Sequence, residues 1–213
     1  MNVNKNFLFI FCIASSVTFG QQTLTKSKSL VIATIEKHQS NLIKISDDIW
    51  SLAETAFEEH KSSKILADYA ENQGFTVERG VAGMPTAFVA SYGSGKPVIS
   101  VLGEFDALPG LSQKTEPIKN PLMKGAAGHG CGHNMFGAGS LGAAIGIKEL
   151  IESGQIQGTI KFFGTPSEEK YFGKIWMVRA GLWDDVDVNI SWHPSASTEA
   201  DVQSSLALID FKI

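Results

Sequence analysis

The 213-residue chain is poor in cysteine and in charge, and each shortage excludes a class of protein. It has two cysteines, one of them within the first twenty residues, so Cys131 has no disulfide partner in the rest of the sequence. Charged residues make up 19%, the net charge is −4 and no cluster of Lys and Arg interleaves with aromatics, so no nucleic-acid partner is predicted. The 43% of hydrophobic residues is enough for the core of one globular domain, which excludes a disordered or fibrous chain.

The first twenty residues are typical of a secretory signal peptide. A short basic start at 2–5 precedes an apolar stretch at 7–14 and small residues at 18–20 that suit cleavage. The apolar stretch is too short to span a bilayer comfortably, so no stable membrane anchor is expected. We therefore expect a secreted or periplasmic protein, in which metal binding would protect the unpaired Cys131 thiol from oxidation. The alternative is an apolar tail on a cytosolic protein.

Apolar periodicity predicts an alternation of helices and strands. Spacings of three and four between Ile35 and Ala56 predict a long helix over about 29–57. Further helices are predicted at 62–72, 135–151 and 172–180, and strands at 75–78, 87–92, 98–102, 159–163, 186–192 and 205–213. This order favours an α/β fold with a mostly parallel sheet flanked by helices.

Residues 137–142 match the dinucleotide-binding pattern Gly-x-Gly-x-x-Gly. That pattern requires an apolar strand directly before it, because the glycines form the turn from strand to helix. Here the glycine-rich segment 128–133 comes before it. We therefore interpret these glycines as small residues that let a helix pack closely on the sheet. A nucleotide-dependent enzyme is the alternative.

Polar side chains follow three of the predicted strands, at the point where each strand ends. In open α/β sheets the reactive groups collect at the carboxyl ends of the strands. The residues at these strand ends are Glu104, Asp106, Glu168, Glu169 and His193. Cys131 and His133 lie at the start of a predicted helix. The sequence therefore predicts that these groups meet at one edge of the sheet.

Cys131 and His133 lie two positions apart in a glycine-rich run. A thiolate and an imidazole at that spacing are typical metal ligands, although a buried thiol beside a turn histidine is the alternative. The adjacent Glu168 and Glu169, in an extended segment, would point apart, so that one carboxylate could bind a metal while the other acts as a general base. Two solvated acids in a loop are the alternative for this pair.

The sequence context decides which of three further histidines belongs to the predicted site. Pro194 restricts His193 to an extended backbone, which would direct its ring outward from the end of the sheet, although an imidazole hydrogen-bonded beside a proline turn is the alternative. His38 falls on the apolar stripe of the first helix and is expected to be a packed, hydrogen-bonded residue. His60 is expected at the surface. Only His193 is therefore included in the predicted site.

Four ordered motifs resemble the amidohydrolases of metallopeptidase family 20, and within it the subgroup that acts on p-aminobenzoyl-glutamate. They are GEFDALPGLS at 103–112, GHGCGHN at 128–134, GTPSEE at 164–169 and WHP at 192–194. The resemblance implies a zinc-peptidase-like α/β catalytic domain with an inserted lid and dimerisation domain. It also implies cleavage of the amide bond of N-acyl or aminobenzoyl amino acids, or of small peptides.

The resemblance implies a role for each site residue. Cys131, His133, Glu169 and His193 would bind one or two divalent ions, Zn or Mn. Glu168 would be the general base, which takes a proton from water and returns it to the departing amine. Asp106 would be a carboxylate that supports a ligand or lies in the catalytic site. Glu104 stands where related peptidases place a metal histidine and is not assigned as a ligand.

The resemblance also implies a domain organisation. Residues 1–20 would be the signal peptide, 21–203 the N-terminal part of the catalytic domain and 204–213 the start of the lid, before the last metal histidine of the family. A homodimer is implied for the full-length protein, with a small-molecule amide as substrate. A second hypothesis is a catalytically inactive, metal-binding module of the same fold.

Overall fold

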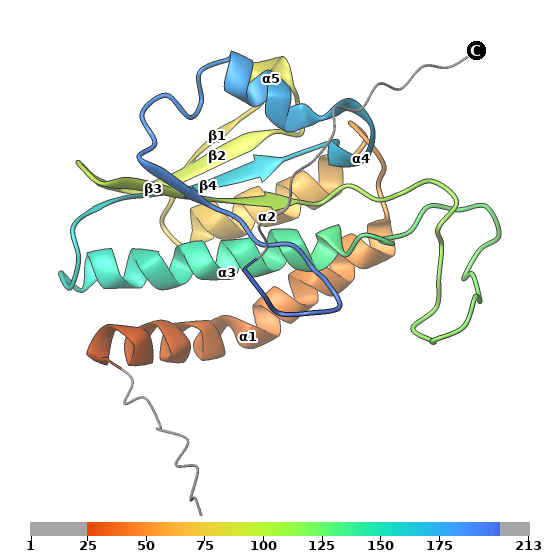
Figure 1. Cartoon of the computed structure of the whole chain (residues 1–213), viewed down its shortest axis with the longest axis horizontal. Helices are drawn as coiled ribbons and strands as arrows, with labels where there is room; N and C mark the ends of the chain where they lie inside the picture. Colours follow the sequence, from red (N-terminus) through yellow and green to blue (C-terminus); the bar gives the residue numbers. More distant parts are fainter. Residues whose placement is uncertain (1–24, 201–213) are drawn as a thin grey trace, which may run out of the picture.

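A five-stranded sheet lies between two layers of helix in the computed structural model, which describes residues 25–200 (Figure 1). The predicted signal peptide and the strand at 205–213 lie outside the described residues. The elements are α1 (Lys26–Leu52), α2 (His60–Asn72), β1 (Thr76–Arg79), a 3₁₀ turn (Val81–Gly83), β2 (Phe88–Ser94), β3 (Val98–Glu104), α3 (His133–Glu152), β4 (Gly158–Thr165), α4 (Glu168–Tyr171), α5 (Gly173–Arg179) and β5 (Val188–Ile190). No helix of this part of the chain is long and apolar enough to cross a membrane.

The sheet has the order β1-β2-β4-β3-β5 and confirms the α/β prediction. β3 pairs in parallel with both β4 and β5, whereas β2 pairs antiparallel with β1 and β4. Four strands therefore run in one direction and β2 opposes them, so the sheet is mixed. α3 connects the parallel strands β3 and β4, and the carboxyl ends of β3, β4 and β5 consequently meet at one edge.

Alternating residues of the strands fill two separate cores. On β4, Ile160 and Phe162 pack with α1, α2 and α3, while Phe163 points to the opposite face. That second face is covered by Met177 of α5 and by the following turn, where Trp183 stacks on Phe163 with ring centroids 4.1 Å apart. Figure 1 shows α1 and α3 on one side of the sheet and α5 on the other. The period of two in β4 thus explains why both faces are buried.

The first helix ends earlier than its apolar pattern predicted. α1 stops at Leu52, because Ala53 adopts a left-handed conformation (φ 44°) and its N–H bonds to Ile49 O at 3.0 Å. The next residue, Glu54, then uses its carboxylate to accept hydrogen bonds from the N–H groups of Lys61 and Ser62 at the start of α2. The prediction of a helix to residue 57 was wrong because Ala53 is left-handed and Glu54 bonds to N–H groups at the start of α2, up to eight residues ahead, in place of continuing α1.

The glycines of 137–142 lie inside α3 and serve close packing, as the sequence interpretation proposed. A Cβ on Gly137 would lie 2.9 Å from the backbone oxygen of Glu104, and one on Gly142 would lie 2.9 Å from Leu42 of α1. A Cβ on Gly139 would lie 2.7 Å from the Trp192 ring. The three glycines therefore bring α3 against the sheet, α1 and the segment after β5, and they form no strand-to-helix turn.

Substituting Gly137 with alanine should destabilise the fold by roughly 1–3 kcal/mol, because the added methyl group meets fixed backbone of β3. The matched control is Gly146→Ala in the same helix, where the methyl group meets side-chain atoms and no backbone, with Val31 Cγ1 at 3.0 Å and Ile35 at 3.8 Å. The control should be neutral or slightly stabilising, since alanine favours a helix. Urea unfolding of both variants measures the difference, and equal midpoints would contradict the packing argument.

Candidate metal centre

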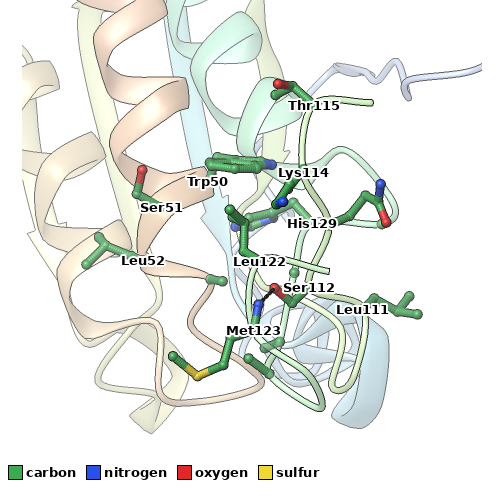
Figure 2. A pocket seen from close by; sticks show the side chains of 16 residues that line it. Trp50, Ser51, Leu52, Leu111, Ser112, Lys114, Thr115, Leu122, Met123 and His129 are labelled. Carbon is green, nitrogen blue, oxygen red and sulfur yellow. Dashed lines mark hydrogen bonds between the residues drawn. The ribbon is translucent and has the colours of Figure 1, made fainter. Parts of the chain in front are cut away.

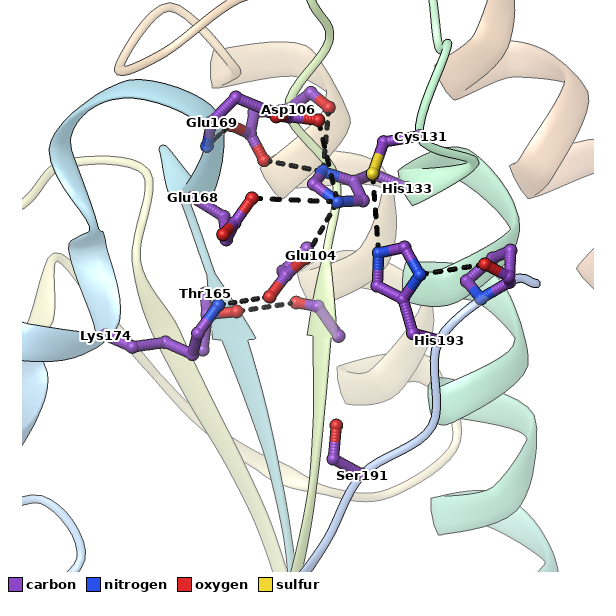
Figure 3. Close-up of polar contacts among 12 residues, drawn as sticks. Glu104, Asp106, Cys131, His133, Thr165, Glu168, Glu169, Lys174, Ser191 and His193 are labelled. Carbon is purple, nitrogen blue, oxygen red and sulfur yellow. Dashed lines mark hydrogen bonds and ion pairs between the residues drawn. The ribbon is translucent and has the colours of Figure 1, made fainter. Parts of the chain in front are cut away.

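The carboxyl edge of the sheet gathers the polar side chains that the sequence singled out. Glu104 ends β3, Asp106 follows it by two residues, and the Glu168–Glu169 pair and His193 follow β4 and β5. Gly132, in a left-handed conformation (φ 76°), turns the chain into α3 and makes His133 its first residue. Figure 3 shows these side chains converging on the His133 ring from separate elements.

His133 is the centre of this cluster and is fully buried. Its Nδ1–H donates to Asp106 Oδ1 at 2.9 Å, and its Nε2 lies 2.8 Å from Glu104 Oε2. Burial alone would lower the pKa of His133, but the hydrogen bonds to Asp106 and Glu104 outweigh it and raise that pKa to about 10. The surroundings of this ring therefore favour positive charge strongly.

The two acids after β4 approach the same ring nitrogen. Glu169 Oε1 lies 3.8 Å and Glu168 Oε2 lies 4.0 Å from His133 Nε2. Both residues lie in the one-turn helix α4, so the expected extended conformation of this pair was wrong. Both carboxylates still face His133, because successive side chains of a helix are only about 100° apart.

Cys131 and His193 form the other side of the cluster. Cys131 Sγ lies 3.5 Å from His193 Nε2, and His193 Nδ1–H donates to Pro194 O at 2.9 Å, which leaves the Nε2 lone pair directed at the thiol. Burial, with the negative charges of Glu169 and Glu168, raises the pKa of the Cys131 thiol to about 11. A thiolate at this position therefore requires a nearby cation.

The aromatic residues around α3 hold His193 in place. Trp192 Nε1–H donates to Ser140 Oγ at 3.0 Å, and the Phe136 ring packs edge-on against both Trp192 and His193. Gly139 leaves the space in which the Trp192 ring lies on α3. The packing of Trp192, one residue earlier in the chain, thus directs the exposed His193 toward Cys131.

The residues fit a divalent cation by two independent observations. Within residues 25–200, Glu169 Oε1 is a buried polar atom without a hydrogen-bond partner, and it faces His133 Nε2 at 3.8 Å. Ligand atoms also lie within 4.8 Å of one another in two sets that share His133, namely Cys131, His133 and His193, and Glu104, His133 and Glu168. Sulfur, imidazole and carboxylate donors suit zinc, and the carboxylates also suit manganese.

Glu104 and Lys174 are site residues that sequence reasoning left unassigned. Glu104 pairs with His133 through one oxygen and with Lys174 of α5 through the other. Burial would raise the pKa of Glu104, but the hydrogen bond to His133 and the charge of Lys174 outweigh it and hold that pKa below its usual range. The position of Glu104 at the end of β3, two residues before Asp106, was the available signal for Glu104. No pattern in the sequence indicated that Lys174 belongs to the site.

The remaining histidines stay outside the cluster, as predicted for two of them. His38 Nδ1 lies 2.7 Å from the Tyr69 hydroxyl, and His60 is exposed. His129, which the sequence did not single out, lies 3.0 Å from Ile49 O through Nε2, and burial lowers its pKa to about 4. None of the three belongs to either set of candidate ligand atoms found among residues 25–200.

Two cavities flank this edge of the molecule. One of about 560 Å³ lies between the end of α1 and the loop 111–130, bordered by Trp50, Leu122 and His129 (Figure 2), and it contains none of the candidate ligands. The other, of about 940 Å³, is bordered by Glu104, Trp192 and His193 and adjoins the cluster directly. The second cavity is therefore the one that can bring a small molecule to the candidate centre.

An α/β domain that gathers thiol, imidazole and carboxylate groups at the carboxyl edge of its sheet has the construction of a metal-dependent hydrolase. The profile of peptidase family M20/M25/M40 matches residues 100–206, and the chain belongs to this family. The resemblance seen in the four motifs is thereby confirmed.

Relatives of this chain are longer proteins. A p-aminobenzoyl-glutamate hydrolase subunit from Escherichia coli (strain K12) is 47% identical over 76% of this chain and 34% of its own length. The Xaa-Arg dipeptidase of Mus musculus is 31% identical over 78% of this chain and 38% of its own length. The crystal structure of the Bacillus subtilis YXEP protein, a dinuclear metal binding peptidase from the M20 family, matches in fold with a TM-score of 0.64 and 24% identity, over 77% of this chain and 44% of that one. The chain thus covers less than half of the length of each of these three proteins.

Replacing Asp106 with alanine should weaken divalent-metal binding by about 10- to 100-fold, because the Glu169 N–H loses its acceptor and His133 Nδ1 keeps only the backbone oxygen of residue 106, at 3.1 Å. Asp185→Ala is the control, since that exposed carboxylate pairs only with Lys161 among the residues described and lies away from the cluster. Competition titration against a zinc-binding dye measures both affinities. An Asp106→Ala protein that binds metal as tightly as the control would show that Asp106 does not orient the ligands.

Proposed function

We propose that this chain is the N-terminal part of a metal-dependent amidohydrolase that cleaves the amide bond of N-acyl or aminobenzoyl amino acids, or of small peptides. The observation that carries the proposal is the position of Glu168, a carboxylate 4.0 Å from His133 Nε2 and 33% exposed, beside buried ligand atoms. Support also comes from the 47% identity to a relative that is named as part of a p-aminobenzoyl-glutamate hydrolase. A purely structural metal site needs no such accessible acid, which argues against the inactive module.

The proposed ligands are Cys131, His133, Glu169 and His193, which would hold one or two ions of zinc or manganese. Glu169 is assigned as the ligand and Glu168 as the base because Glu169 is the more buried of the two, at 15% against 33% exposure. Asp106 is proposed to keep the proton on His133 Nδ1, so that the Nε2 lone pair is available for a metal.

In the proposed reaction, the side chains of this chain move one proton and hold the ligands in place. A divalent ion bound here supplies a Lewis acid that polarises the amide carbonyl and lowers the pKa of water. Glu168 takes a proton from the attacking water at its carboxylate and returns it to the departing amine nitrogen. The cavity of about 940 Å³ beside His193 provides room for the substrate.

We also propose a secreted or periplasmic location, a cleaved signal peptide at residues 1–20 and a homodimer of the full-length protein. The basic and apolar pattern of the first twenty residues supports export. The catalytic domain is proposed to cover residues 21–203, with the lid starting at 204–213. Homodimerisation rests on the family resemblance of the sequence motifs.

Purified protein should retain zinc or manganese near stoichiometry after exhaustive dialysis, as measured by elemental mass spectrometry. Changing Cys131 to serine together with His133 to alanine removes two ligands of the same set and should remove the metal. His60→Ala, an exposed histidine, is the control and should retain it. A metal content that does not respond to the double change would refute this ligand set.

The Glu168→Gln substitution should lower turnover of an aminobenzoyl amino acid by roughly 10²- to 10⁴-fold while metal stays bound, because the amide cannot accept the proton from water. Glu58→Gln, at an exposed position close to α2, is the control and should hydrolyse normally. The rate of release of free aminobenzoate, followed by absorbance, measures both variants. Near-normal hydrolysis by Glu168→Gln would assign the base elsewhere.

A further inference from the structure

Glu59 is a fully buried acid at the start of α2 that has no part in the proposed reaction. Its Oε1 accepts a hydrogen bond from the backbone N–H of Ser167 at 2.9 Å, while its Oε2 has no hydrogen-bond partner within residues 25–200. Burying a carboxyl group without a basic partner is costly. The hydrogen bond to Ser167, which joins residues 108 positions apart, therefore indicates what Glu59 is for.

The partner of Glu59 is a strained residue. Ser167 is buried and adopts a left-handed conformation (φ 56°, ψ 41°), which costs a non-glycine residue about 1 kcal/mol or more. Such a conformation persists only where surrounding contacts fix it. Ser167 directly precedes α4, so its backbone angles determine the direction in which the next two residues leave β4.

A second carboxylate holds the same segment two residues later. Asp106 Oδ2 accepts a hydrogen bond from the Glu169 N–H at 2.9 Å. The backbone from Ser167 to Glu169 is therefore bound at two amides by acids from two different elements. Glu168 lies between these two points, and the positions of both glutamate side chains relative to His133 depend on them.

We propose that Glu59 is a positioning residue that fixes Ser167 in its left-handed conformation and thereby sets the placement of Glu168 and Glu169 beside His133. The effect on metal binding rests on the proposed function, whereas the effect on the Ser167 backbone does not. The link is a single hydrogen bond of 2.9 Å from the Ser167 N–H to Glu59 Oε1, and a side chain one methylene shorter should break it.

The protonation of Glu59 agrees with this role. Burial raises the pKa of Glu59 to about 7, and the nearby negative charge of Asp106 acts in the same direction. A neutral carboxyl group keeps an oxygen that can accept from Ser167 and avoids an unpaired buried charge. Glutamine, with the same length and one acceptor oxygen, should therefore replace Glu59 well, whereas aspartate should not.

The test compares Glu59→Gln and Glu59→Asp in the full chain, using hydrogen exchange of peptides that cover residues 165–172, without added metal. Glu59→Gln should keep the protection of the unchanged protein. Glu59→Asp retains the acid but cannot reach Ser167, so exchange in this segment should be at least about tenfold faster and zinc affinity about tenfold weaker. Both variants are conservative, so each should fold.

Ser100→Ala is the matched control, because it removes a partly buried hydrogen bond to Asn189 on the sheet while leaving Ser167 untouched. It should leave exchange at 165–172 and zinc affinity unchanged. The proposal is overturned if Glu59→Asp behaves as the unchanged protein, if Glu59→Gln is as defective as Glu59→Asp, or if exchange rises equally in α1 and α3. A protein that binds no metal would refute the proposed function alone, since exchange at Ser167 is read without metal.

Discussion

The hydrogen bonds of one carboxylate, that of Asp106, hold the site together. One oxygen accepts from His133 at the start of α3 and the other accepts from the Glu169 amide in α4, while its own backbone continues β3. Three elements that are distant in sequence are therefore fixed relative to one another by a single buried group. A side chain with two acceptor oxygens is suited to this task, because each oxygen can serve a different element.

The charges of the site make its stability depend on a cation. Glu104, Asp106, Glu168 and Glu169 all face the same imidazole, and like charges at this separation repel one another. Lys174 compensates part of this charge through Glu104. The cluster is thus arranged so that one further positive charge near His133 Nε2 is favourable, which is the electrostatic condition for holding a divalent ion.

Small residues and irregular backbone position this charged cluster on a rigid core. Gly137 and Gly139 let β3 and Trp192 approach α3 closely, while Gly132 and Ser167 adopt left-handed conformations beside the ligands. The regular elements provide the fixed edge, and these few residues direct side chains toward its centre. Strained or closely packed backbone therefore concentrates where the candidate ligands are.

The sequence by itself determined the alternation of strands and helices, the packing role of the α3 glycines and the motifs that carry Cys131, His133 and the Glu168–Glu169 pair. These features depend on local periodicity and on chain order, which a sequence records directly. Tertiary structure alone decided that Glu168 and Glu169 lie in a helical turn, that Glu104 pairs with Lys174 and that Glu59 holds Ser167. The last two contacts join residues 70 and 108 positions apart, and no local pattern encodes which distant group will complete a hydrogen bond.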